Sequence, residues 1–111
     1  DIKYFRKEEF ACRCGKHCNG YPVEIKEKLV KLADMVREHF DSPVIVSSGI
    51  RCENHNAAVG GVSNSRHLYG KAMDFCVSGY SATVVLDYVE KLPGIRYAYA
   101  IDSNYVHMDI E

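Results

Sequence analysis

The chain has 111 residues, with 14 Lys or Arg against 15 Asp or Glu, and its formal net charge is −1. This balance excludes the strong positive field that nucleic-acid or anionic-membrane binding needs, and no apolar run approaches the roughly twenty residues that cross a bilayer. The length predicts one domain over residues 1–111, with a single core. No secretory signal is visible and the first residue is Asp1, so we expect a processed form or an excised domain.

Residues 1–20 are expected to form an irregular, cysteine-containing arm. Tyr4, Phe5 and Phe10 lie among charged residues and would hold the arm on the core, and Asn19-Gly20 predicts a turn. The sequence leaves open whether the arm also forms part of a substrate groove.

The cysteine count is high and odd. The five are Cys12, Cys14, Cys18, Cys52 and Cys76. In an extracellular protein this number predicts two disulfides and one free thiol, with the pairing left open. The alternative is a structural metal held by the three N-terminal cysteines with His17, but their spacing is not that of the usual zinc fingers. We therefore favour disulfides or reduced thiols over a second metal.

The first regular element is expected to be an amphipathic helix that begins near Pro22 and Val23 and ends at about Phe40. Apolar residues recur along it at intervals of three and four, and charged residues occupy its other faces. The apolar set is Ile25, Leu29, Leu32, Val36 and Phe40; the charged set is Lys26, Glu27, Lys31, Asp34 and Glu38. Its expected role is packing.

Further elements follow in short succession. A buried strand is predicted at 44–47, a short helix at 53–59, a strand at 71–77, a helix from its N-cap Ser81 to Leu92, and two strands between Ile95 and Glu111. This order predicts an α+β fold, a small antiparallel sheet with helices packed on one side. An arginine after the first strand, Arg51, would by default be a surface charge.

The chemistry-bearing stretch is Ser65-Arg66-His67-Leu68-Tyr69-Gly70-Lys71-Ala72-Met73-Asp74, together with the later Val106-His107-Met108-Asp109. Two imidazoles and one carboxylate are the ligand types that hold a catalytic zinc with one position open for water. On the strand at 71–77, Asp74 should face away from the apolar layer of Met73, Phe75 and Val77. Gly70 should let the backbone turn tightly before that strand.

The pattern S-x-H-x-x-G-x-A-x-D resembles the signature of the bacterial and phage zinc D-Ala-D-Ala peptidases, the peptidase M15 group of carboxypeptidases, cell-wall endopeptidases and endolysins. The resemblance extends to Ser48-Gly49-Ile50-Arg51, to the segment 56–61 and to the terminal Val-His-Met-Asp. Several distinct elements agree in order and spacing, which makes the match specific. The fold that it implies is shared with the hedgehog signalling domain.

The resemblance implies one catalytic Zn²⁺ held by His67, Asp74 and His107, with peptidoglycan stem peptides as the substrate. It also implies a cell-wall-directed monomer outside the cytoplasm, of bacterial or phage origin. Arg51 would contact substrate as a catalytic or binding group, Ser65 would bind substrate or steady the ligand loop, and Tyr105 would hydrogen-bond the tetrahedral intermediate.

The general base has two candidates on the sequence, Asp109 and Asp102. A two-residue turn at Ser103-Asn104 would pair Asp102 with Tyr105, which places Asp102 on the face of His107 and Asp109, above a floor formed by Ala98 and Ala100. Asp109 is our choice of base, although it could equally orient His107 through a hydrogen bond, and Asp102 is the other candidate.

Three functions compete on the sequence alone. The first is a zinc carboxypeptidase or endopeptidase of the cell wall. The second is a binding module of the same fold that keeps the metal and has lost turnover. The third, a disulfide-stabilised domain without metal, requires the spacing of His67, Asp74 and His107 to be a coincidence.

Overall fold

The computed structural model describes residues 2–111. The elements found there are η1 (Lys7–Phe10), α1 (Glu27–Phe40), β1 (Val44–Ser48), α2 (Glu53–Ala58), η2 (Arg66–Tyr69), β2 (Ala72–Val77), α3 (Ala82–Val89), β3 (Ile95–Ala100) and β4 (Val106–Ile110), where η denotes a 3-10 helix. Within residues 2–111 no helix has the length and apolar character needed to cross a membrane.

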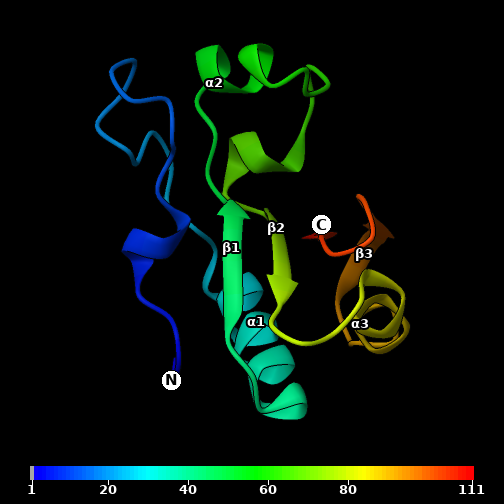
Figure 1. The fold of residues 1–111 in the computed structure, drawn as a ribbon. Helices are drawn as coiled ribbons and strands as arrows, with labels where there is room; N and C mark the ends of the chain where they lie inside the picture. The colour runs from blue at the N-terminus through cyan, green and yellow to red at the C-terminus, as the bar shows by residue number, and fades with distance from the viewer. Residues whose placement is uncertain (1) are drawn as a thin grey trace.

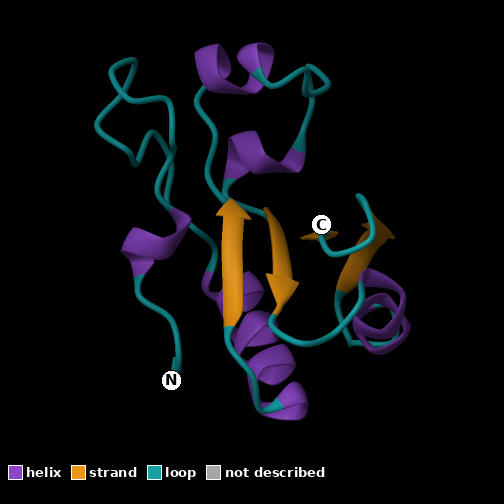
Figure 2. Ribbon diagram, in the orientation of Figure 1, coloured by secondary structure: helices purple, strands orange, loops and turns teal. Residues whose placement is uncertain are grey.

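The four strands form one antiparallel sheet in the order β1-β2-β4-β3, with helices packed against it (Figures 1 and 2). This confirms the predicted α+β class. Met73, Phe75 and Met108 point into the core, where apolar residues of α1 and α3 meet them. Because side chains alternate along a strand, Asp74 and His107 lie on the opposite face of the sheet.

Helix α1 begins four residues later than the sequence predicts. The backbone N–H of Lys26 donates to the carbonyl oxygen of Gly70 at 2.9 Å, a tertiary contact that keeps residues 22–26 out of the helix. Gly70 has φ +70°, and a Cβ atom there would collide with the backbone of Glu24. Glycine at position 70 is therefore needed for the turn and for this close approach.

The hairpin of β3 and β4 has a different register from the predicted one. Ala100 pairs with Val106, so five residues, 101–105, separate the strands. Tyr99 consequently pairs with His107, and Tyr97 with Asp109. A shift of one residue reverses which side chains face which way, so the predicted floor of Ala98 and Ala100 is wrong.

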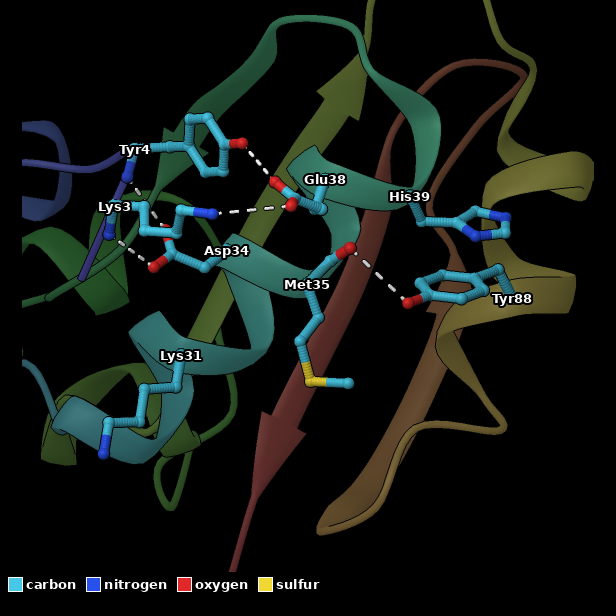
Figure 3. A pocket seen from close by; sticks show the side chains of 8 residues that line it. All are labelled: Lys3, Tyr4, Lys31, Asp34, Met35, Glu38, His39 and Tyr88. Atoms are coloured by element: carbon cyan, nitrogen blue, oxygen red, sulfur yellow. Dashed lines mark hydrogen bonds and ion pairs between the residues drawn. The ribbon is translucent and has the colours of Figure 1, made fainter. Parts of the chain in front are cut away.

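The N-terminal arm is fixed to α1 by a buried carboxylate (Figure 3). Asp34, predicted to lie on a polar face of α1, is instead buried and accepts hydrogen bonds from the backbone N–H groups of Lys3 at 2.6 Å and Tyr4 at 3.1 Å. Glu38, one turn further along, accepts from the hydroxyl of Tyr4. The arm is thus held by polar contacts as well as by its aromatic residues, of which Phe10 is fully buried.

Replacing Asp34 with alanine should lower the free energy of unfolding by about 2 kcal/mol, because two backbone N–H groups lose a charged acceptor. Urea titration would measure the change. Asp87→Ala is the matched control, since Asp87 pairs with Lys91 at the surface and its loss should cost less than about 1 kcal/mol. Equal effects of the two substitutions would show that Asp34 does not fasten the arm.

Candidate metal centre

Three side chains that are far apart in the sequence meet on the face of the sheet opposite the apolar core. Oδ1 of Asp74 lies 3.2 Å from Nε2 of His67 and 2.8 Å from Nδ1 of His107. All three residues are buried, and their ligand atoms lie within 4.8 Å of one another. The cluster therefore has the composition and spacing of a site for a divalent cation.

The elements around the cluster explain its placement. Asp74 of β2 and His107 of β4 are direct partners in the antiparallel ladder, which brings residues 33 apart in sequence side by side. His67 lies in η2, whose N-cap Ser65 accepts a hydrogen bond from the backbone N–H of His67 at 3.2 Å. Ser65 thus steadies the loop that carries His67.

Each imidazole uses its second nitrogen in a hydrogen bond. Nδ1 of His67 lies 2.7 Å from the carbonyl oxygen of Gly49, an acceptor that requires N–H at this nitrogen. Nε2 of His107 lies 2.7 Å from Oδ2 of Asp109. If both rings are neutral, these bonds use their only protons, and the nitrogens that face Asp74 present lone pairs. Three electron-rich atoms then converge, and a bound cation is what stabilises that arrangement.

Asp74 is negatively charged in this environment. Burial by itself raises the pKa of a carboxyl group, but when the nitrogens of His107 and His67 that face Asp74 carry protons, their hydrogen bonds hold the pKa of Asp74 well below its usual range. Nη2 of Arg51 lies 3.2 Å from the outer oxygen, Oδ2, of the same carboxylate. The inner oxygen is left to face the two imidazoles.

Arg51 is held in place by a network of its own. Its Nε donates to Oγ of Ser48 at 3.0 Å, and its Nη1 donates to Oδ1 of Asn56 at 3.1 Å. The side chain borders two hollows in the surface, one of about 450 Å³ that contains His67, Asp74 and His107, and one of about 960 Å³ beside the N-terminal arm. Arg51 therefore lies both next to the metal cluster and at the edge of a larger groove.

Asp109 lies behind His107, away from solvent. The residue is 1% exposed. Arg96 donates two hydrogen bonds to its carboxylate, from Nε to Oδ1 at 2.7 Å and from Nη2 to Oδ2 at 2.9 Å. Oδ2 also accepts from His107. Both oxygens are thus engaged, and they fix the orientation of the His107 ring.

Two residues that the sequence favoured are not in the cluster. Asp102 is exposed in the loop between β3 and β4, where its carboxylate accepts from the backbone N–H groups of Asn104 and Tyr105, so its predicted position on the site face is wrong. Tyr105 borders a different hollow, beside Cys76. The five-residue loop and its one-residue change of register explain both differences.

Three residues of the site were not identified from the sequence. The ring of Tyr99 stacks on His107 with centroids 4.8 Å apart, Arg96 holds Asp109, and Asn56 holds Arg51. Alternation along β3 identifies Tyr99 only when the register is known. Arg96 lies at an irregularity of the β3–β4 pairing between Ile95 and Tyr97, which alternation along the strand does not reveal. Asn56 is the first residue of a segment already associated with the motif.

Comparison with known proteins shows the family of this chain. The family model described as Peptidase M15 matches residues 3–109. The chain belongs to the peptidase M15 family. Over 44 residues it is also 48% identical to a protein named zinc D-Ala-D-Ala carboxypeptidase from Streptomyces albus G.

Membership of the peptidase M15 family confirms the resemblance inferred from the motif. The aligned region with the Streptomyces albus G protein covers 40% of this chain and 17% of the relative. The chain thus spans well under two thirds of that relative. The peptidase M15 match covers nearly all of the chain, from residue 3 in the N-terminal arm to residue 109 in β4.

Proposed function

We propose that this chain is a zinc-dependent peptidase that hydrolyses peptide bonds in peptidoglycan stem peptides, with one Zn²⁺ held by His67, Asp74 and His107. The observation that carries the proposal is the convergence of these three ligand atoms, with the remaining nitrogen of each imidazole already bound to another group. Membership of the peptidase M15 family supports hydrolysis as the reaction.

The metal would supply the part of the chemistry that side chains cannot. A bound zinc ion lowers the pKa of a water molecule towards about 7 and polarises a carbonyl group. The chain holds and orients the ligands: Gly49 fixes the ring of His67, Asp109 fixes that of His107, and Arg51 holds the outer oxygen of Asp74. All three ligands are therefore in place before substrate arrives, which lowers the cost of reorganisation.

The proposal gives Asp109 an orienting role in preference to that of general base. A base needs an oxygen that can reach a water molecule beside the substrate, and both oxygens of Asp109 are bound to Arg96 and His107. Asp109 is also only 1% exposed, so little of its carboxylate is accessible to a water molecule. Asp109 then increases the basicity of His107 as a ligand.

Substrate contacts fall to the residues around the smaller hollow. Arg51 lies where the two hollows meet and presents a planar guanidinium that suits a carboxylate or a polarised carbonyl. Ser65 borders the same hollow, although its hydroxyl is already bound to the loop of His67. Tyr99 is half exposed and covers one side of His107, in the place where a substrate backbone would pass.

Replacing Tyr99 with alanine should lower kcat/KM by roughly threefold to tenfold, because a stacking aromatic surface worth about 1 kcal/mol is lost beside His107. Tyr105→Ala is the matched control and should change kcat/KM by less than about twofold, since Tyr105 borders another hollow. Zinc content should be unchanged in both variants. A larger loss of kcat/KM in Tyr105→Ala than in Tyr99→Ala would instead support the sequence-based prediction that Tyr105 hydrogen-bonds the tetrahedral intermediate.

The substrate class rests on the named activity of the Streptomyces albus G relative. The same named activity implies that this protein acts at the cell wall. The direct test is to incubate zinc-loaded protein with purified peptidoglycan and, separately, with a peptide that ends in D-Ala-D-Ala, and to identify products by mass spectrometry. Release of a single D-Ala identifies a carboxypeptidase, and internal cleavage an endopeptidase. No product from either substrate, with zinc bound, would overturn the proposal.

One observation favours a second candidate, a zinc-containing cell-wall-binding module with weak or no turnover. Among residues 2–111, the carboxylates that border the hollow with the cluster are Asp74 and Asp109, and both are engaged. A proton acceptor for the attacking water is thus missing from that hollow. Co-sedimentation with peptidoglycan, without release of peptide, would identify this function.

A further inference from the structure

A second group of metal-ligating side chains lies outside the His67, Asp74 and His107 cluster. Cys12, Cys14, Cys18 and Cys52 come together where the N-terminal arm meets the start of α2, and their sulfur atoms all lie within 4.8 Å of one another. All five cysteines are unbonded thiols in the structure, and Cys76 lies apart on β2. The sequence analysis considered a metal at the first three cysteines with His17 and placed it below disulfides or reduced thiols. It missed Cys52 as the fourth member, because Cys52 comes 34 residues after Cys18.

The mutual closeness of the four sulfur atoms distinguishes a metal site from two disulfides. Disulfides need only two close pairs, whereas here every sulfur is close to the other three. Around a zinc ion with Zn–S bonds of about 2.3 Å, tetrahedral geometry places sulfur atoms about 3.8 Å apart. Sγ of Cys14 and Sγ of Cys18 lie 3.4 Å apart, near that value.

The surrounding backbone stabilises negative charge on the sulfur atoms. Three backbone N–H groups donate to them: Cys52 N–H to Cys12 at 3.2 Å, Gly20 N–H to Cys18 at 3.3 Å, and His55 N–H to Cys52 at 3.4 Å. Thiolate is the form that binds metal.

Two glycines shape the loop around the cluster. Gly15 directly follows Cys14 and has φ +85°, and Gly20 lies two residues after Cys18 and has φ +98°. These left-handed positions let the chain turn back on itself twice, so that residues 12, 14 and 18 present their side chains to one point. The backbone N–H of Cys12 closes the loop on the carbonyl of Gly20 at 2.7 Å.

We propose that Cys12, Cys14, Cys18 and Cys52 hold a structural zinc ion, a second metal site that fastens the N-terminal arm to the start of α2. Four thiolates leave no open coordination position, so this ion has no part in catalysis. The ion affects the catalytic site only by holding the neighbouring chain in position. Cys52 directly follows Arg51, and Cys18 and Arg51 border the same groove of about 960 Å³, so the ion fixes one wall of that groove.

The first experiment is elemental analysis of protein purified under reducing conditions, combined with a count of thiols after unfolding without reductant. We expect two zinc ions per chain and five titratable thiols. Cys14→Ser should retain one zinc, as should His67→Ala, and the double variant should retain none. Cys76→Ser is the matched control and should keep both ions, because Cys76 is outside the cluster.

A cobalt-loaded sample gives a second readout that does not need a cysteine variant to fold. Cobalt in a four-thiolate site produces strong sulfur-to-metal charge-transfer absorption, and this band should persist in His67→Ala. Three results would each overturn the proposal. The first is a parent protein with one zinc ion that His67→Ala removes. The others are a count of one titratable thiol in place of five, and a cobalt-loaded sample without the charge-transfer band. The two proposals can be disproved independently. A parent protein with a single zinc ion that is kept in His67→Ala and lost in Cys14→Ser would support the cysteine site and contradict the catalytic zinc site.

Discussion

Replacing His67 with alanine should remove the catalytic metal and lower peptidase activity by roughly a thousandfold or more. A metal ion contributes several kcal/mol of transition-state stabilisation, and each 1.36 kcal/mol corresponds to a tenfold change in rate. His67 is 2% exposed, and its ring is already oriented by Gly49, so no neighbouring side chain can replace it as a ligand without rearrangement. Zinc content and the rate of peptide release measure the two effects.

The matched control for this substitution is His55→Ala. His55 lies in α2, outside the metal cluster, and its loss should leave both zinc content and activity within about twofold of the parent. Near-ultraviolet circular dichroism would verify that both variants keep the native packing. Full activity in His67→Ala would exclude this site as the catalytic centre.

Replacing Asp109 with asparagine should weaken zinc binding by roughly tenfold to a hundredfold, the usual cost of losing a group that orients a metal ligand. Asparagine can still accept the hydrogen bond from His107, but it loses the charge that balances Arg96. If Asp109 is an orienting residue, saturating zinc should restore most of kcat. Zinc affinity by competition with a chelating dye, and kcat measured across a zinc titration, separate the two quantities.

The opposite result would identify Asp109 as the general base. In that case zinc affinity would be nearly unchanged, and kcat would fall by roughly a hundredfold or more at every zinc concentration. Asp102→Asn is the matched control, because this carboxylate caps its own loop and has no contact with the cluster. Its substitution should leave zinc affinity unchanged. A loss of kcat in Asp102→Asn alone would transfer the role of base to that residue.

Local patterns were sufficient for much of the fold. The alternation of Met73, Phe75 and Val77 correctly predicted which face of β2 enters the core, and Ser81 caps α3 as expected. These features depend on near neighbours in the chain, whose spacing is visible in the sequence. The order of elements was likewise enough to predict an α+β sheet with helices.

Boundaries that depend on distant contacts were less accurate. The apolar spacing from Val23 onward suits a helix, but the contact between Lys26 and Gly70 takes the first residues away from α1. Asp34 has the sequence position of a solvent-exposed residue and is buried by the arm. In each case the partner lies thirty or more residues away, where periodicity carries no information.

The sequence by itself determined the three candidate ligands, because residue type and spacing in the motif and in Val106-His107-Met108-Asp109 are local properties. Only the tertiary structure decided what surrounds them. The register of β3 against β4 places Tyr99 beside His107, and the irregularity of that pairing between Ile95 and Tyr97 accompanies the contact of Arg96 with Asp109. The path of the arm brings its three cysteines to Cys52. A register and a chain path are fixed by packing across the whole core, so no short stretch of sequence specifies them.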